Sequence, residues 1–394
     1  MKPMKDYSFV KGVNYGWEGR DEVTWRRELG YARRATINSV RIWLRHQKYF
    51  EDPAGYIAHL KDFFRVCHEE GFTVMPIIFN GNEIDAKNPY LLEEAFIEKG
   101  KAYLCDVVAA LHDEPALIMY DVMNEPGCNH LIWDAKDDAE KDYWMQRHWD
   151  FLLPMCRYLR ELDQENAVTV GYWLAAHVGP AEQEGLTNVI SYHDYSPSLK
   201  GIRGNAELAL EAGRKYGLPV MNTETGCIAR GNPYDLVLET MHQLHIPTYI
   251  FNLMIKGYCD DEHGIFYDDG TVRDPAAIAA LMGIFRTRNY ETIIPESPNR
   301  ERGVKRALDR MESLLGENDY GDDGFVYKAV TVEALLDACD SLACYIETAQ
   351  MTGMRIPPTA RVAYFRKQEK PNYWEVKRFA YELATELKKA CYLL

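Results

Sequence analysis

The feature that most constrains the fold of this chain is a repeated alternation between residue 9 and about residue 287. Short apolar runs rich in β-branched residues are separated by longer amphipathic stretches. This pattern is typical of βα units around a parallel sheet, whose strands are buried on both faces. Eight runs fit the description of such strands: residues 9–15, 39–44, 73–79, 117–123, 167–173, 189–193, 219–223 and 248–254.

Eight βα repeats predict an α/β fold of the closed (β/α)8 type, the TIM barrel. An open, doubly wound sheet is the rival, but it would carry a glycine-rich phosphate loop after an early strand. The sequence contains neither GxGxxG nor GxxxxGK. Asp274 and Pro275 predict the start of a last barrel helix that continues to about residue 286. Prolines follow in 293–298, so we expect the catalytic barrel to comprise residues 1–295.

The remaining segment, residues 296–394, has helical periodicity without strand-like runs. Three amphipathic faces stand out, led by Leu308, Leu335 and Phe379. We expect a C-terminal helical extension that packs on the barrel. A stabilising or oligomer-forming role is favoured over direct contact with substrate, so a homo-oligomer is one open outcome.

Composition excludes several classes of partner. A formal net charge of −15 and the absence of a long basic block disfavour nucleic acid and anionic membranes. The longest apolar runs are too short to span a bilayer, and no secretory leader is visible, so we expect a cytoplasmic protein. The 9 cysteines are scattered without zinc-ligand spacing, and the 11 histidines include no HExxH. We therefore expect reduced thiols, no metal and no cofactor.

Two glutamates stand where predicted strands end. Glu125 follows the fourth run and Glu224 follows the seventh. Reactive groups of a TIM barrel lie at the carboxyl ends of its strands, and strands four and seven can face one another across the barrel mouth. Cleavage of an acetal needs a proton donor for the departing oxygen and a second carboxylate at the sugar carbon. Carboxyl groups about 5–5.5 Å apart would give the retaining, two-step route.

The neighbours of these glutamates carry a family resemblance. From about residue 11 to residue 287 the chain resembles glycoside hydrolase clan A and is most similar to the cellulase-like family 5. The motifs that match are Asn124-Glu125-Pro126 for the acid/base, Glu224 after Met221-Asn222-Thr223 for the nucleophile, His193-Asp194-Tyr195 on strand six, and Arg41 on strand two. Four motifs in the right order on the right strands make the resemblance specific.

The resemblance implies a role for each matched residue. Glu125 would be the general acid/base, with a raised pKa, and Glu224 the nucleophile. Asn124 would donate its amide to the sugar 2-hydroxyl, and Tyr195 and Arg41 would hydrogen-bond Glu224. His193 would line the pocket and bond substrate or the acid/base.

The chain also departs from the family pattern. Strand eight has no tryptophan at its end, where Asn252 or Lys256 would suit a different or polar sugar substituent, and strand three ends without the histidine that members often show. Further candidate sugar contacts are Trp17, Trp43, Asn80 and Trp173.

The resulting hypothesis is a retaining β-glycoside hydrolase that acts on β-linked oligo- or polysaccharides of the glucan, mannan or xylan type. The alternative is a non-catalytic carbohydrate-binding barrel in which the altered strand-eight floor prevents turnover. A barrel lyase or aldolase would need a Schiff-base lysine at a strand end, for which Lys256 is the candidate.

Overall fold

The computed structural model describes residues 3–84, 92–256, 262–285, 307–315, 330–348 and 357–392. The described chain divides into two compact units: Met1–Tyr195 with Ile202–Ile284, and Ser196–Gly201 with Phe285–Leu394. The domain boundary predicted near residue 295 lies outside the described residues. None of the helices within the described ranges has the length and apolarity needed to cross a membrane.

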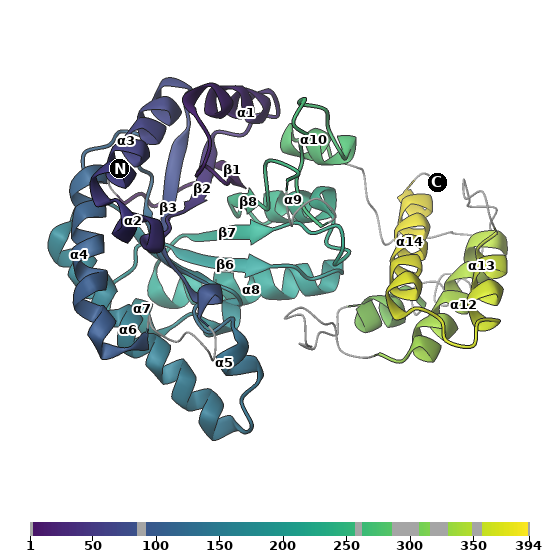
Figure 1. Cartoon of the computed structure of the whole chain (residues 1–394). Coiled ribbons are helices and arrows are strands. Elements are labelled where there is room, and N and C mark those ends of the chain that lie inside the picture. Colours follow the sequence, from purple (N-terminus) through teal and green to yellow (C-terminus); the bar gives the residue numbers. More distant parts are fainter. Residues whose placement is uncertain are drawn as a thin grey trace. The chain divides into compact units, whose positions relative to one another are not determined.

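The first unit is a closed barrel of eight parallel strands in sequential order, which confirms the predicted fold class (Figure 1). The strands are β1 (Lys11–Asn14), β2 (Ser39–Trp43), β3 (Thr73–Asn80), β4 (Tyr120–Asn124), β5 (Val168–Tyr172), β6 (Ile190–Asp194), β7 (Val220–Thr225) and β8 (Thr248–Ile250). Parallel pairing of β8 with β1 closes the barrel.

Helices surround the strands, as Figure 1 shows for this unit. They are α1 (Glu22–Arg34), α2 (His46–Glu51), α3 (Pro53–Glu69), α4 (Glu94–Leu111), α5 (His130–Trp133), α6 (Asp138–Leu162), α7 (Pro180–Gln183), α8 (Leu199–Tyr216), α9 (Tyr234–Gln243) and α10 (Pro275–Leu281). The helix predicted to reach residue 286 is α10, which begins as expected because the Asp274 side chain accepts from the Ala276 N–H. It ends early, since Gly283 adopts φ +80° and its N–H bonds to the Ala280 carbonyl.

The second unit contains a helix over residues 307–315 together with α12 (Val332–Thr348), α13 (Pro358–Arg366) and α14 (Tyr373–Tyr392). These helices enclose an apolar core of their own, which includes Leu308, Leu335 and Phe379 from the three predicted faces. The core also contains Val362 and Phe365 of α13, a helix that the sequence analysis did not identify.

Three irregularities in the barrel ladder position the candidate site. The register shifts between Asp121 and Asn124 where β4 meets β5, at His193 where β6 meets β7, and between Asn222 and Thr225 where β7 meets β8. Such irregularities re-aim side chains at the rim of a barrel. All three occur where a strand carries or adjoins a predicted site residue.

Candidate active site

The two candidate glutamates meet at the carboxyl ends of the strands. Glu125 directly follows β4, and Glu224 is the second-last residue of β7. One carboxylate oxygen of each, together with a ring nitrogen of His193, lie within 4.8 Å of one another. Both glutamates are almost buried, at 6% and 7% exposure. The structure therefore brings two side chains 99 positions apart in the sequence into one small space that still reaches solvent.

Arg41 links the nucleophile candidate to the barrel interior. Its Nη1 donates to Glu224 Oε2 at 3.0 Å and to Asn14 Oδ1 at 3.0 Å. Its Nε and Nη2 both donate to Asp121 Oδ2, at 3.0 and 2.8 Å, and Nη2 also donates to Asn124 Oδ1 at 2.7 Å. Burial lowers the pKa of Arg41, but the charges of Asp121 and Glu224 outweigh that effect and raise it above its ordinary value. Arg41 is therefore a permanent cation that orients Glu224.

Tyr195 holds the second oxygen of Glu224. Its hydroxyl donates to Glu224 Oε1 at 2.8 Å, while Arg41 occupies Oε2. Burial and the adjacent charge of Glu224 raise the pKa of Tyr195 well above its ordinary value, so the hydroxyl keeps its proton as a donor. Each oxygen of Glu224 thus has one protein donor, as the resemblance implied for these two residues.

Glu125 is bound by two nitrogen groups. His193 Nδ1 lies 2.7 Å from Oε1, and Asn82 Nδ2 donates to Oε2 at 2.9 Å. Burial raises the pKa of Glu125, but the hydrogen bond and the positive charge of His193, aided by Asn82, outweigh burial and hold the pKa at about 2. The expectation of a raised pKa was therefore wrong for this arrangement. It considered the negative charge of Glu224 but not the groups that donate hydrogen bonds to the Glu125 carboxylate.

Asn124 is placed beside both glutamates, but its amide is engaged within the protein. Its Nδ2 donates to Asn80 Oδ1 at 3.1 Å and to Asn82 Oδ1 at 2.7 Å, and its Oδ1 accepts from Arg41. A sugar 2-hydroxyl that bonded this amide would have to displace Asn80 or Asn82. Asn80 and Asn82 stand at the end of strand three, where the family's histidine is missing.

A cavity of about 300 Å³ has Asn80, which accepts a hydrogen bond from Asn124, among its lining residues, but neither Glu125 nor Glu224 lines it. Four predicted sugar contacts line it: Trp17, Trp43, Asn80 and Asn252. Trp173 is not among the described residues that line it, and its ring instead contacts His177 at 4.8 Å. Trp17 is itself only 1% exposed, because its indole N–H donates to the Trp43 carbonyl.

An aromatic side chain does stand just beyond β8. Phe251 lines the cavity and meets Trp43 edge to face, with ring centroids 5.6 Å apart. Lys256, the candidate for Schiff-base chemistry, instead forms ion pairs with Glu28 at 3.0 Å and Asp268 at 2.7 Å. Partial burial lowers the pKa of Lys256, but these carboxylates outweigh it and raise the pKa, which is opposite to what an amine nucleophile needs.

Sequence reasoning missed three polar residues of the site. Asp121 and Asn14 bind Arg41, and Asn82 binds Glu125. For Asp121 and Asn14 a signal was present, because each is a polar residue inside an otherwise apolar barrel strand and a buried polar group needs a partner. Asn82 lies in a short 3-10 turn, Gly81–Glu83, and carried no such signal.

Comparison with known proteins gives a family and several structural relatives. A family profile described as Cellulase (glycosyl hydrolase family 5) matches residues 5–257, well over half of the chain. No curated protein matches the chain. Among solved structures, a β-galactosidase from the psychrophilic Marinomonas ef1 is similar, with 13% identity and a TM-score of 0.53 over 78% of this chain and 62% of that chain.

Two endo-mannanases are similar as well. The enzyme from Thermotoga petrophila RKU-1 has 15% identity and a TM-score of 0.51, covering 70% of this chain and 99% of its own. The enzyme from Rhizomucor miehei has 12% identity and a TM-score of 0.50, covering 69% and 92%. At these identities the structural likeness establishes the fold alone. The family match, which covers the barrel through its eighth strand, shows that this chain belongs to the cellulase family, glycosyl hydrolase family 5, and is a glycoside hydrolase.

Proposed function

We propose that this glycoside hydrolase works by retaining double displacement, with Glu224 as nucleophile and Glu125 as general acid/base. The observation that carries the proposal is the close approach of the two carboxylates, with oxygens within 4.8 Å. Retaining enzymes place their carboxyl groups about 5–5.5 Å apart, whereas inverting enzymes leave about 6.5–9.5 Å for a water molecule. The separation here is on the retaining side.

In the first step Glu224 attacks the anomeric carbon while the bond to the leaving oxygen breaks. Arg41 and Tyr195 hold Glu224 through one oxygen each, so the attacking carboxylate needs little reorganisation. The leaving oxygen takes a proton from Glu125, and the alcohol departs. The products of this step are the glycosyl ester of Glu224 and an ionised Glu125.

His193 supplies the proton that Glu125 delivers. Its Nδ1 lies 2.7 Å from Glu125 Oε1, so the two groups can share one proton before substrate binds. As the leaving oxygen approaches, the proton moves from Nδ1 to Glu125 and then to that oxygen, leaving neutral His193. This transfer fits a pair of coupled groups that share one proton.

In the second step the ionised Glu125 acts as base. It removes a proton from water, and the oxygen of that water attacks the anomeric carbon and breaks the ester to Glu224. The hydrogen bonds from His193 and Asn82 keep Glu125 ionised until it takes the proton.

We propose β-linked oligo- or polysaccharides of the glucan, mannan or xylan type as substrates. The cavity that Asn80 connects to the site is lined by the rings of Trp43 and Phe251 and by the amides of Asn80 and Asn252, together with charged side chains, Glu18, Arg20, Arg45, Glu83 and Lys256. Aromatic faces pack against the C–H faces of sugar rings, while amides bond the hydroxyls. The rings and amides of this lining support a sugar unit in the cavity.

The test is turnover of aryl β-glycosides by two variants and a control. Glu224→Ala and Glu125→Gln should each lower kcat by on the order of a thousandfold or more, since each removes a group that acts on the reacting atoms. Azide should restore turnover to Glu224→Ala and give an α-glycosyl azide. Glu184→Gln is the matched control: Glu184 is an exposed carboxylate that pairs with Arg157 and does not line the cavity, so its kcat should stay within a few-fold. Near-normal kcat in either catalytic variant would refute the assignment.

A further inference from the structure

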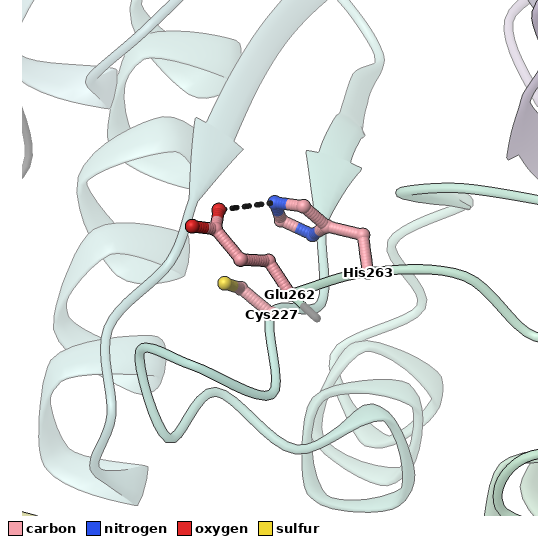
Figure 2. A group of neighbouring side chains, drawn as sticks. All are labelled: Cys227, Glu262 and His263. Atoms are coloured by element: carbon pink, nitrogen blue, oxygen red, sulfur yellow. Dashed lines mark ion pairs between the residues drawn. The ribbon is translucent and has the colours of Figure 1, made fainter. Parts of the chain in front are cut away.

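A second cluster of side chains lies on the same rim, outside the residues used above. Cys227 stands two positions after β7, and Glu262 and His263 belong to the segment after β8. A sulfur, a carboxylate oxygen and a ring nitrogen from the three lie within 4.8 Å of one another. Figure 2 shows the three side chains pointing toward a common space, with the Glu262 carboxylate 3.8 Å from His263 Nε2.

The backbone fixes the positions of these residues. The Ile228 N–H donates to the Glu262 carbonyl at 2.8 Å, which joins the loop after β7 to the segment after β8. Cys227 and Asn232 exchange two backbone hydrogen bonds, of 3.0 and 2.9 Å. Backbone hydrogen bonds therefore hold together the two segments that carry Cys227 and Glu262.

His263 has the tautomer that a metal-binding histidine needs. Its Nδ1 lies 2.8 Å from the Gly226 carbonyl and donates to it, so Nε2, which lies 3.8 Å from a Glu262 carboxylate oxygen, keeps its lone pair. Metal-ligating histidines characteristically donate their other ring nitrogen to a carbonyl or carboxylate, which fixes the tautomer. The His263 ring is also held edge to face against Phe251, with centroids 4.7 Å apart.

The donor set selects the kind of ion. A thiolate, an imidazole and a carboxylate suit zinc, whereas calcium and magnesium take oxygen ligands. Tetrahedral zinc holds its ligand atoms about 3.5 Å apart, so ligand atoms that lie within 4.8 Å of one another need to approach by up to about 1.3 Å. The positive charge of Arg230 also acts on Cys227 and His263 and opposes a cation there. The thiolate and carboxylate together offset the two charges of the ion.

We propose that Cys227, Glu262 and His263 bind one zinc-type divalent cation, with water as the fourth ligand. The ion would fasten the loop after β7 to the segment after β8. The His263 ring contacts the ring of Tyr195 at 5.8 Å, and Tyr195 bonds Glu224. The ion thus supports the wall behind the nucleophile without touching the reacting atoms.

The experiment measures Zn²⁺ and Co²⁺ binding to the full chain after treatment with a chelator. Calorimetric titration with Zn²⁺ should give one equivalent per chain. Cys227→Ala and His263→Gln should each weaken binding by more than about 100-fold, because loss of outer contacts alone costs 10- to 100-fold. Cys156→Ala, which removes an equally buried thiol from α6, should bind as the wild type does.

Two further results show which of two side-chain groups binds the ion. The Glu125–His193–Glu224 group has a similar ligand spacing, so Glu125→Gln tests whether the ion binds there. Full binding by Glu125→Gln supports the proposal, and loss of binding in that variant overturns it. Bound Co²⁺ should show a thiolate charge-transfer band in the wild type, a result that needs no variant to fold. Absence of zinc binding, absence of that band, or wild-type affinity in Cys227→Ala would also overturn the proposal.

Discussion

The side chain of Asn82 forms hydrogen bonds with both Glu125 and Asn124. Its amide donates to Glu125 Oε2 at 2.9 Å and to the Cys128 carbonyl at 3.1 Å, and its oxygen accepts from Asn124. A donor on a carboxylate stabilises the ionised form and lowers its pKa. Asn82 is therefore a positioning residue that also sets the protonation of Glu125.

Replacement of Asn82 should change the pH profile in a defined direction. In Asn82→Ala the Glu125 carboxylate loses a donor, so its pKa rises and the protonated acid persists to higher pH. The limb of kcat/KM that reports Glu125 should move up by about one to two pH units, because a hydrogen bond to a charged group contributes about 1.5–3 kcal/mol.

Asn80→Ala is the matched control, since Asn80 also accepts a hydrogen bond from Asn124 but, within the described part of the chain, makes none with Glu125. The same limb should stay in place in this variant even if KM changes. An unmoved limb in Asn82→Ala, or a shift to lower pH, would contradict the role given to Asn82.

At the residue scale, the sequence predicted the members of the site better than their bonding. Glu125, Glu224, Arg41, His193 and Tyr195 were identified from strand ends and family motifs, and the structure brings them together. The partners of Asn124 could not be read from its neighbours, because Asn80 and Asn82 meet it only once β3 and β4 pair. The same contacts reversed the expected direction of the Glu125 pKa.

At the scale of elements, a close approach between two strand ends fixes the acid/base. Glu125 adopts φ +48°, a sparsely populated conformation for a non-glycine residue. Its carbonyl oxygen lies against Gly81, where an added Cβ would come within 2.3 Å of it. The turn after β3 therefore supports the backbone that aims Glu125.

Gly81→Ala should displace that backbone and lower both stability and activity. We expect a loss of about 1–3 kcal/mol in the free energy of unfolding from the steric overlap. The value of kcat should fall by about 10- to 100-fold, since a small misplacement of a catalytic group is costly.

Gly30→Ala provides the contrast, because Gly30 lies within α1 and an added Cβ there would meet nothing within 4 Å. It should stabilise the protein by about 0.5–1 kcal/mol and leave kcat unchanged. Denaturant unfolding and initial rates of both variants check these expectations. Normal kcat in Gly81→Ala would show that the turn after β3 does not position Glu125.

The barrel was predictable because eight buried strands leave a strong apolar pattern, and the observed strands begin within three residues of the predicted ones. The ends of strands, and helices without a clear amphipathic pattern, were harder to predict. β8 stops at Ile250, four residues before the predicted end. Helix α13 was missed because two adjacent prolines, Pro357 and Pro358, stand at its start and its apolar side chains do not gather on one face.

At the scale of the whole molecule, the described chain has separate cores in its two units. The helical unit buries Leu342, Phe379 and Leu383 among its own helices, and the barrel unit has a different cluster that includes Phe63 and Leu60. Each core should therefore contribute its own unfolding transition.

Phe379→Ala tests that separation. Removing a fully buried phenylalanine costs about 3–5 kcal/mol, so the transition of the helical unit should move to lower temperature in calorimetry. Glycosidase activity measured below that transition should be unchanged. Phe63→Ala, placed in the barrel core, should instead lower the other transition. Loss of activity in folded Phe379→Ala would show that the helical unit contributes to catalysis.

The most direct measurement of the central claim is the anomeric configuration of the first product, followed by proton NMR during hydrolysis of an aryl β-glycoside. Two carboxylates this close predict that the β-anomer appears first and then mutarotates. Initial release of the α-anomer would mean that water attacks directly. Glu224 would then not be the nucleophile.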